Sequence, residues 1–193
     1  MKEIGIYLGS FNPVHMGHLM IANSIINKTE LDEVWMVLSP LSPDKVKSAV
    51  SDLHRFEMLK IALKNVNYIK ASDIELNLPL PSFTINTVQF LKNKFPKLTF
   101  SLIIGQDNAN SFKNWKNVHH LYDFFKNIYV YPRLNNETTA IDNDKLTLLD
   151  LPIVQVSSTK IRENIELGLK IDFLVLPKVK EYIIKHKLYL LDK

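Results

Sequence analysis

The 193-residue sequence contains no cysteine, which excludes a disulfide scaffold, thiolate catalysis and zinc sites built from thiolates. It also contains no apolar run of about 18 residues, so we expect no membrane-spanning helix. The first residues lead directly into a predicted strand, without the apolar stretch and small-residue cleavage site of a secretory signal. We therefore expect a cytoplasmic protein without a membrane partner.

Neither sign of charge dominates the sequence, because 24 Lys and Arg residues stand against 20 Asp and Glu residues. The net charge of +4 would suit nucleic acid, an anionic surface or phosphorylated small molecules, and it is too small to select among them. Hydrophobic residues make up 46% of the chain, which excludes a disordered or fibrous protein. A chain of this length can bury a sizeable core, so we expect residues 1–193 to form a single domain.

Short runs rich in β-branched and aromatic residues alternate along the chain with longer helical patterns. The predicted strands are 4–8, 34–38, 68–71, 99–104, 128–131 and 153–156. The predicted helices are 16–28, 52–65, 85–95, a broken 108–125, 159–167 and 178–187, and we expect 39–52 and 132–150 to be surface loops. This alternation favours an α/β fold with a doubly wound, mostly parallel sheet, whose ligands bind beyond the carboxyl ends of the strands.

Glycine is scarce, and three of the five glycines, Gly9, Gly17 and Gly105, fall where a strand gives way to a loop or helix. Glycine at such a position lets backbone N–H groups approach a ligand closely. Residues 9–18 read GSFNPVHMGH, so a strand, a tight loop and a helix start follow one another. That order predicts an anion site, because unpaired N–H groups and the helix dipole both favour phosphate.

Two histidines lie in this segment, and His15 and His18 are three residues apart. If the helix has begun, they share one face and can both reach the bound anion. The alternative is that one histidine caps the helix while the other packs against the sheet. A zinc pair is disfavoured because no obvious third ligand lies nearby, and the glycine spacing fits neither a Walker loop nor a dinucleotide fingerprint.

Two segments together resemble the nucleotidylyltransferase superfamily, which transfers a nucleoside monophosphate from a triphosphate and releases pyrophosphate. Residues 9–18 resemble its phosphate-binding signature, and residues 156–162, VSSTKIR, resemble its second signature, a Ser-Ser-Thr turn that opens a helix. The hydroxyls there can cap the helix, and Arg162 can offer a planar fork to phosphate oxygens. The alternative for Arg162 is a surface pair with Glu166. The resemblance implies a Rossmann-like nucleotidylyltransferase fold.

Within the superfamily, three further segments resemble the bacterial nicotinate mononucleotide adenylyltransferases. They are PSFTINT at 81–87, IGQD at 104–107 followed by Trp115, and the tail from FLVLP at 173–177 to Tyr189. The resemblance spans nearly the whole chain and is weakest at 132–150. It implies that Thr84 and Trp115 border the nicotinate ring. The alternatives are that Thr84 caps the helix that follows and that Trp115 lies in the core.

The resemblance also implies a complete set of binding residues. The ATP site would comprise Gly9, Ser10, Phe11, His15, His18, Lys45, Gly105, Asp107, Ser157, Ser158, Thr159 and Arg162, and the nicotinate mononucleotide site would comprise Ser10, Asn12, Thr84 and Trp115. Asp107 would face the ribose or the adenosine end, unless it caps the next helix. Asp44 stands before Lys45 where relatives usually carry histidine, and Ser10 and Asn12 replace the usual threonine and aspartate.

The implied reaction is attack by the phosphate of nicotinate mononucleotide on the α-phosphorus of ATP. His15, His18 and Arg162 would be the catalytic residues by neutralising charge, and Mg²⁺ would arrive with ATP, without metal ligands from the protein. The same site could instead adenylylate phosphopantetheine or nicotinamide mononucleotide, or use CTP. A nucleic-acid-binding protein is the alternative of another class, although no nucleic-acid signature is present and we expect no nucleic-acid partner. The sequence leaves the oligomeric state open.

Overall fold

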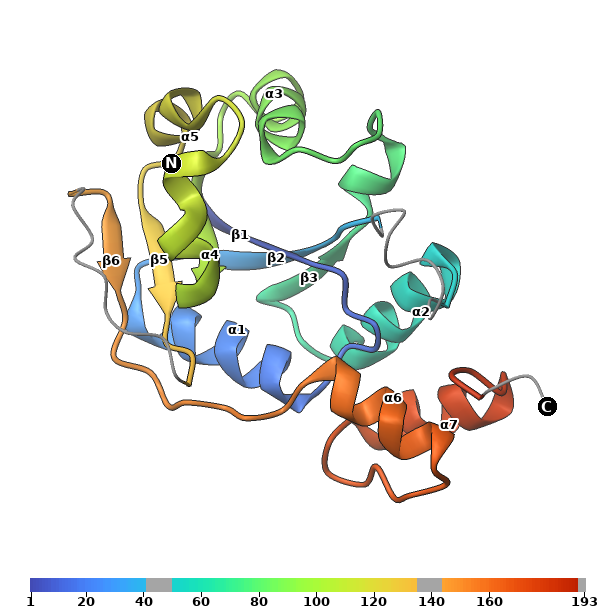
Figure 1. Cartoon of the computed structure of the whole chain (residues 1–193). Helices are drawn as coiled ribbons and strands as arrows, with labels where there is room; N and C mark the ends of the chain where they lie inside the picture. Colours follow the sequence, from blue (N-terminus) through green and yellow to red (C-terminus); the bar gives the residue numbers. More distant parts are fainter. Residues whose placement is uncertain (41–49, 135–143, 191–193) are drawn as a thin grey trace.

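The computed structural model describes residues 1–40, 50–134 and 144–190 (Figure 1). In this part of the chain one six-stranded sheet has the order β3-β2-β1-β4-β5-β6, and every neighbouring pair is parallel. The strands are β1 (Glu3–Gly9), β2 (Glu33–Leu38), β3 (Ile69–Ser72), β4 (Thr99–Gly105), β5 (Ile128–Tyr131) and β6 (Leu146–Leu148). The order reverses between β1 and β4, which is the switch point where Rossmann-like sheets bind ligands.

Helices cover both faces of the sheet. They are α1 (Met16–Lys28), α2 (Asp52–Leu63), the 3-10 helix η2 (Ile74–Asn77), α3 (Thr84–Lys94), α4 (Gln106–Ser111), the 3-10 helix η3 (Phe112–Asn114), α5 (Val118–Phe124), α6 (Ser158–Glu166) and α7 (Pro177–Lys185). In Figure 1, α3 and α5 lie above the sheet, α1 and α2 lie below it, and α6 and α7 lie beside α2.

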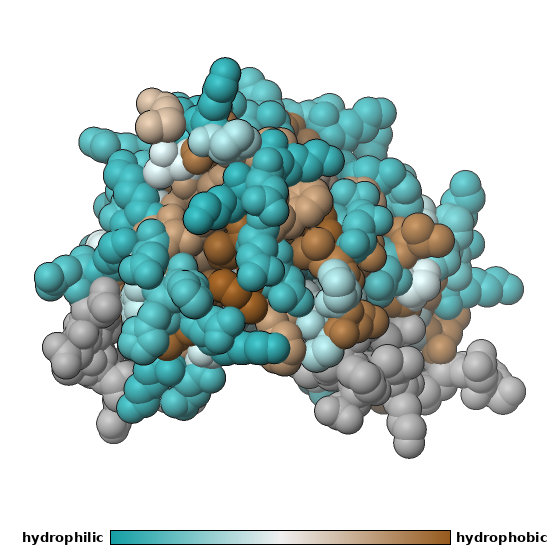
Figure 2. Space-filling model, turned by 90° about the horizontal axis from the view of Figure 1, so that it is seen from above, coloured by the Kyte–Doolittle hydropathy of each residue, from teal (hydrophilic) through white to brown (hydrophobic). Residues whose placement is uncertain are grey.

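The two faces of the sheet form two apolar clusters, because successive side chains of a strand point to opposite sides. Ile103 packs into the cluster shared with α1 and α2, whereas its neighbours Leu102 and Ile104 pack into the cluster shared with α3 and α5. Both faces are therefore buried, as expected for a parallel sheet between helices. Seen from above, apolar side chains also reach the surface among hydrophilic ones (Figure 2). Ile85 of α3 and Phe124 of α5 line a hollow of about 540 Å³.

One predicted strand is wrong. Residues 153–156 form no strand, and Ile153 is 51% exposed. The sixth strand is instead β6, inside the segment 132–150 that we expected to be a loop, and its Leu146 pairs with Ile128 of β5. The polar composition around β6 suits an edge strand, whereas 153–156 is an extended connection that carries Val156 to the core beside α6.

The other elements agree with the sequence to within two residues at their ends. The broken helix predicted at 108–125 is divided into α4, η3 and α5. Asn117 separates η3 from α5 in a left-handed conformation with φ of 56°, which an α-helix does not accommodate. Asparagine adopts this conformation more readily than most residues, so the break follows from the side chain at this position.

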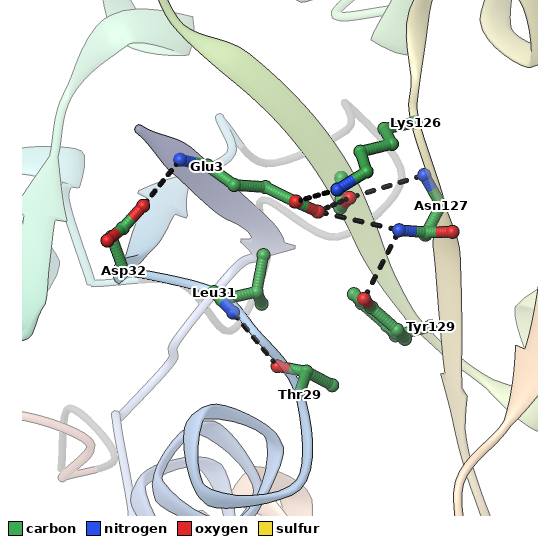
Figure 3. A network of polar contacts seen from close by, with 8 residues as sticks. Glu3, Thr29, Leu31, Asp32, Lys126, Asn127 and Tyr129 are labelled. Atoms are coloured by element: carbon green, nitrogen blue, oxygen red, sulfur yellow. Dashed lines mark hydrogen bonds and ion pairs between the residues drawn. The ribbon is translucent and has the colours of Figure 1, made fainter. Parts of the chain in front are cut away.

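A polar network secures the amino end of the sheet (Figure 3). The buried carboxylate of Glu3, at the start of β1, accepts hydrogen bonds from Ser101 Oγ and Lys126 Nζ, both at 2.6 Å. Although burial alone would raise it, these hydrogen bonds hold the pKa of Glu3 below its ordinary value. The network ties β1 to β4 and to the residues before β5. It lies at the amino ends of the strands, opposite the expected ligand crevice at their carboxyl ends.

Candidate active site

The loop between β1 and α1, residues 10–15, lies at the carboxyl end of β1 beside the switch point. Phe11 has φ of 41° and turns its buried ring back over Gly9, where an added Cβ would lie 2.8 Å from the ring. The ring also packs edge-on against Tyr7 and His18. The Phe11 side chain thus belongs to the core, and only its main chain remains for the ATP contact expected from the sequence.

The carbonyl groups of Gly9, at the end of β1, and of Ser10, at the start of the loop, bind donors from the β2 side of the sheet. The carbonyl of Gly9 accepts from the backbone N–H of Ser39 at 2.9 Å. The carbonyl of Ser10 accepts from Nη1 of Arg55, which also donates to the carbonyl of Ser39 at 3.0 Å. Nη2 of Arg55 pairs with Asp52, and the Arg55 side chain is 0% exposed. Arg55 therefore holds together the segments that follow β1 and β2.

Arg55 lies in no sequence motif. Its helical pattern nevertheless contained a signal, because Arg55 falls on the same face of α2 as the buried Met58, Leu59 and Ala62. A charged residue on the apolar face of a helix needs fixed partners, since an unpaired buried charge is costly. That position could have identified Arg55 as a clamp on neighbouring loops.

The next carbonyl groups of the loop bind donors from the second signature. Arg162 Nη1 donates to the carbonyl of Asn12 at 2.8 Å, and Ser158 Oγ donates to the carbonyl of Pro13 at 3.0 Å. Nη2 of Arg162 also donates to Thr159 Oγ1 at 3.3 Å. The two signatures, about 150 residues apart in sequence, therefore meet directly. Arg162 has this partner in the loop, so the surface pair with Glu166 is not its role here.

Ser157 caps α6, since its Oγ accepts from the backbone N–H of Lys160 at 3.2 Å. The hydroxyls of Ser157, Ser158 and Thr159 thus all lie at the α6 N-terminus, beside the β1–α1 loop. With the carbonyls of Ser10, Asn12 and Pro13 bound to donors outside the loop, the loop's remaining amides and the unpaired donors at the start of α6 can bind an anion.

His15 and His18 cap α1 reciprocally. The backbone N–H of His18 donates to Nδ1 of His15 at 3.4 Å, and the backbone N–H of His15 donates to Nδ1 of His18 at 3.3 Å. Their rings stack at 3.6 Å between centroids. Because each Nδ1 accepts a hydrogen bond, the proton of each neutral ring is on Nε2. The alternative of one capping histidine and one packed against the sheet is correct for His15, while His18 caps the same helix and also packs edge-on against Tyr7 of β1. Each ring keeps an Nε2–H group, and contact of both with an anion stays a prediction.

The environment keeps both imidazoles neutral. Burial, together with the positive charge of Arg133, lowers the pKa of His15 from 6.5 to about 4. Burial, the neighbouring His15 and Arg133 lower the pKa of His18 well below its ordinary value. Gly17 makes room for this pair, because a Cβ there would lie 3.0 Å from Nδ1 of His15. An anion placed beside the rings would raise both pKa values.

A second polar group lies at the carboxyl ends of β4 and β5. Asp107 is not the cap of α4, whose N-cap is Gly105. Its carboxylate instead lies 3.7 Å from Nε of Arg133, whose Nη2 donates to the hydroxyl of Tyr131 at 3.1 Å. Arg133 was not expected in the site, because residues 132–150 were predicted to be a surface loop. Arg133 follows the carboxyl end of β5, and that position was the signal for a ligand contact.

The two residues expected at the nicotinate ring lie on neighbouring segments. Thr84 is the first residue of α3, and the cap position belongs to Phe83, so the capping alternative for Thr84 is wrong. Trp115 is partly buried and packs against Phe112 at 4.9 Å, so the core alternative holds in part. Lys116 Nζ lies 4.4 Å above the Phe83 ring, which brings the Thr84 and Trp115 segments into contact.

The remaining expectations concern Lys45, a metal site and a membrane-spanning helix. Lys45 and its neighbour Asp44 lie outside the described residues. Among the residues that the structure describes, no group of three or more His, Asp or Glu side chains could hold a metal ion. In the same part of the chain, no helix combines the length and apolar character needed to cross a membrane.

The chain is similar to nucleotidylyltransferases by family model, by sequence and by structure. A model of the Cytidylyltransferase-like family matches residues 6–164. The chain is 45% identical over 185 residues to a probable nicotinate-nucleotide adenylyltransferase of Flavobacterium psychrophilum, covering 94% of this chain and 95% of that protein. It is 35% identical over 191 residues to the nicotinate-nucleotide adenylyltransferase of Bacillus subtilis, covering 98% and 99%. The structure of Plasmodium falciparum nicotinic acid mononucleotide adenylyltransferase complexed with NaAD matches with a TM-score of 0.81 and 25% identity, covering 98% of both chains.

Proposed function

The chain belongs to the nicotinate-nucleotide adenylyltransferases within the Cytidylyltransferase-like family, and we propose that it transfers AMP from ATP to nicotinate mononucleotide. The products are deamido-NAD and pyrophosphate, so the reaction belongs to NAD biosynthesis. The described residues build one sheet with helices on both faces, which supports the proposal that residues 1–193 form a single domain.

The observation that carries the proposal is the junction between the two signatures. Arg162 and Ser158 of α6 bind the carbonyls of Asn12 and Pro13, at the switch point of the sheet. The α6 hydroxyls, the imidazole Nε2–H groups and the loop amides thereby belong to adjoining segments. Among the described residues, the hydrogen-bond partners of the α6 hydroxyls include no carboxylate of that helix. Such a set of donors suits the phosphates of ATP.

The reaction needs no strong base, because the phosphate of nicotinate mononucleotide is already an anion near neutral pH. One of its oxygens forms a bond to the α-phosphorus of ATP, and the bond from that phosphorus to the β-phosphate oxygen breaks. The electron pair of the broken bond leaves with pyrophosphate. Catalysis then consists of positioning and of stabilising the charge on the phosphates. In this proposal His15 and His18 donate from Nε2 to the ATP phosphates.

The cationic side chains supply the remaining charge stabilisation. Arg162 faces the triphosphate from α6, and Arg133, which the structure adds, faces it from the end of β5. Asp107, paired with Arg133 at 3.7 Å, is available to the ribose of ATP. Gly9, Ser10, Gly105 and the main chain of Phe11 contribute the close backbone approach, and Lys45 remains part of the proposed ATP site.

Mg²⁺ is proposed to arrive as a complex with ATP, where it shields the negative charge of the phosphates. The described residues fit this arrangement, because His15 and His18 use both Nδ1 atoms to accept backbone hydrogen bonds. They offer a metal only protonated Nε2 atoms, so the phosphates themselves would hold the ion. The protein contributes donors around the phosphates rather than a cage of ligands.

The acceptor side of the site is formed by the segments around Thr84 and Trp115. Their contact through Phe83 and Lys116 supports a pocket with a flat indole wall and the α3 N-terminus close by. The free backbone N–H groups of that helix end suit the carboxylate of nicotinate. Asn12 and Ser10 complete the proposed site from the β1–α1 loop.

The test is pyrophosphate release from ATP and Mg²⁺ with nicotinate mononucleotide, nicotinamide mononucleotide and phosphopantetheine offered separately. We expect turnover chiefly with nicotinate mononucleotide. Turnover chiefly with another acceptor would retain the phosphate chemistry and overturn the assignment around Thr84. Absence of turnover with all three would overturn the proposed function, and salt-dependent oligonucleotide binding would then identify a nucleic-acid-binding protein.

A further inference from the structure

Tyr189, near the carboxyl end of the described residues, reaches the β1–α1 loop from the far end of the chain. Its hydroxyl donates a hydrogen bond to Oδ1 of Asn12 at 2.9 Å, although the two residues are 177 positions apart. Tyr189 is 9% exposed and Asn12 is 5% exposed. This buried contact is separate from the bonds that Arg55, Arg162 and Ser158 make to the loop, because it involves the Asn12 side chain.

The chain adopts an unusual backbone conformation to bring Tyr189 there. Lys187 and Tyr189 have φ values of 51° and 63°, in the left-handed region that side-chain-bearing residues rarely occupy. The turn follows α7 directly, and the backbone N–H of Leu188 donates to the carbonyl of Ile183 at 3.0 Å. Such conformations persist where surrounding contacts determine them, so the turn is a built feature that directs the phenol inward.

The contact between Tyr189 and Asn12 joins a protonated phenol to an amide oxygen. Burial raises the pKa of Tyr189, while the positive charges of Arg162 and Arg55 oppose that rise, so the phenol stays protonated and donates. The hydrogen bond from the phenol to Oδ1 ties the buried Asn12 side chain to the C-terminal segment. The Asn12 side chain is therefore held in place beside Arg162, which binds the carbonyl of the same residue.

We propose that Tyr189 is a positioning residue for the nucleotide loop, acting through Asn12. It supports the loop from the C-terminal side, where no residue of either signature provides a side-chain contact to Oδ1 of Asn12. This inference rests on the proposed function for its consequence in turnover, but the effect on ATP binding does not depend on the acceptor. The contact also explains how a residue outside both signatures contributes to the site.

The test compares Tyr189→Phe with Tyr182→Phe. Both changes remove one hydroxyl with a 2.9 Å hydrogen bond from the same C-terminal segment, but Tyr182 contacts His54 and not the loop. We expect Tyr189→Phe to lower kcat/KM for ATP about tenfold, the scale of one well-placed hydrogen bond, whereas Tyr182→Phe stays within about twofold. Melting temperatures measured in parallel report the purely structural effect of each change. Equal kcat/KM values for the two variants would overturn the inference.

A double-mutant cycle tests the route through Asn12. If Tyr189 acts through that amide, Asn12→Ala already removes the effect, and Asn12→Ala with Tyr189→Phe has the same kcat/KM as Asn12→Ala alone. Multiplication of the two single effects would show that Tyr189 acts elsewhere and would overturn the proposed route.

Titration calorimetry with ATP and Mg²⁺ separates this inference from the proposed function. Wild-type protein that binds ATP without turnover of nicotinate mononucleotide would overturn the function alone, and the dissociation constant would still test Tyr189. About tenfold weaker ATP binding by Tyr189→Phe supports the inference, and binding within about twofold of wild type overturns it. Wild-type protein that binds no ATP would overturn both.

Discussion

The stacked imidazoles of His15 and His18 have two functions that depend on the same nitrogen atoms. Their Nδ1 atoms accept the backbone N–H groups that begin α1, and this leaves Nε2–H as the donor on each ring. A glutamine at either position could supply a cap or a donor, but a single rigid ring supplies both at a fixed separation. The start of the helix therefore sets the geometry of the donors.

His18→Ala is expected to lower kcat at least about 100-fold, the usual effect of losing a preorganised donor to developing charge. Steady-state pyrophosphate release measures this change. His119→Ala serves as the matched control, because His119 is exposed on α5. Turnover of His18→Ala close to that of the control would contradict the proposed role.

Folding stability is expected to decrease as the pH falls from about 6.5 towards 4. Unfolded His15 binds a proton below its ordinary pKa of 6.5, whereas folded His15 does so only near its lowered pKa of about 4. Within that window the unfolded state binds more protons, so acidification favours unfolding. Thermal melts from pH 7 to pH 4 measure the effect. His15→Asn retains a capping side chain without an imidazole, so its melting temperature should fall less steeply than that of wild type.

At the scale of elements, Arg55 makes α2 the support for two loops. Its guanidinium binds the carbonyls of Ser10 and Ser39, which follow β1 and β2, while its helix packs against the sheet and against α7. The position of the nucleotide loop thus depends on a helix that contributes no group to the proposed chemistry.

Arg55→Met is expected to reduce the free energy of unfolding by about 1.5–3 kcal/mol, because the carbonyl groups of Ser10 and Ser39 lose hydrogen bonds from a charged donor. Urea denaturation measures the change. Lys60→Met on the same helix is the control, since Lys60 is half exposed and its contacts with Glu57 and Phe56 lie within α2. That control is expected to change stability by less than about 1 kcal/mol. A similar loss in both variants would contradict the role of Arg55 as a clamp.

The periodic elements were predictable from the sequence because apolar residues recur at the spacing of their buried faces. The exception was β6, whose Leu146 and Leu148 are separated by threonine in a polar context that resembles a loop. Residues 153–156 are more apolar, but they pair with none of the strands of the described sheet. Local composition cannot reveal which segment reaches the edge of a sheet, since pairing depends on the distant strand β5.

The candidate site was predictable where sequence motifs are contiguous. His15, His18, Ser158 and Arg162 stand in two short segments, and the structure brings these segments together. Contiguous motifs do not contain Arg55, Arg133 or Tyr189. Arg55 and Tyr189 bind the β1–α1 loop from distant parts of the sequence, and Arg133 pairs with Asp107 across the ends of β4 and β5. Their partners follow only from the tertiary structure, although the positions of Arg55 on α2 and of Arg133 after β5 were signals in the sequence.

For the molecule as a whole, the carboxyl and amino ends of the strands have different roles. The proposed nucleotide site lies at the carboxyl ends of the strands, whereas the network around Glu3 lies at their amino ends (Figure 3). Glu3 and Ser101 are both buried, so their hydrogen bond at 2.6 Å contributes to stability far from the phosphates.

Ser101→Ala is expected to reduce the free energy of unfolding by about 1.5–3 kcal/mol, the range for a hydrogen bond to a charged group. We expect kcat and KM to stay within about twofold of wild type when assayed well below the melting temperature. Ser111→Ala, which removes an exposed hydroxyl from α4, should leave both properties nearly unchanged. A loss of activity in Ser101→Ala that exceeds its loss of folded protein would show that the network around Glu3 affects the nucleotide site.

The direction of β1 determines how the protein can be attached to a solid support. Met1 is 98% exposed and precedes the amino end of β1, so a linker at Met1 leaves the molecule on the side away from the nucleotide loop. Immobilisation through the amino end should therefore leave the nucleotide site open to dissolved substrates.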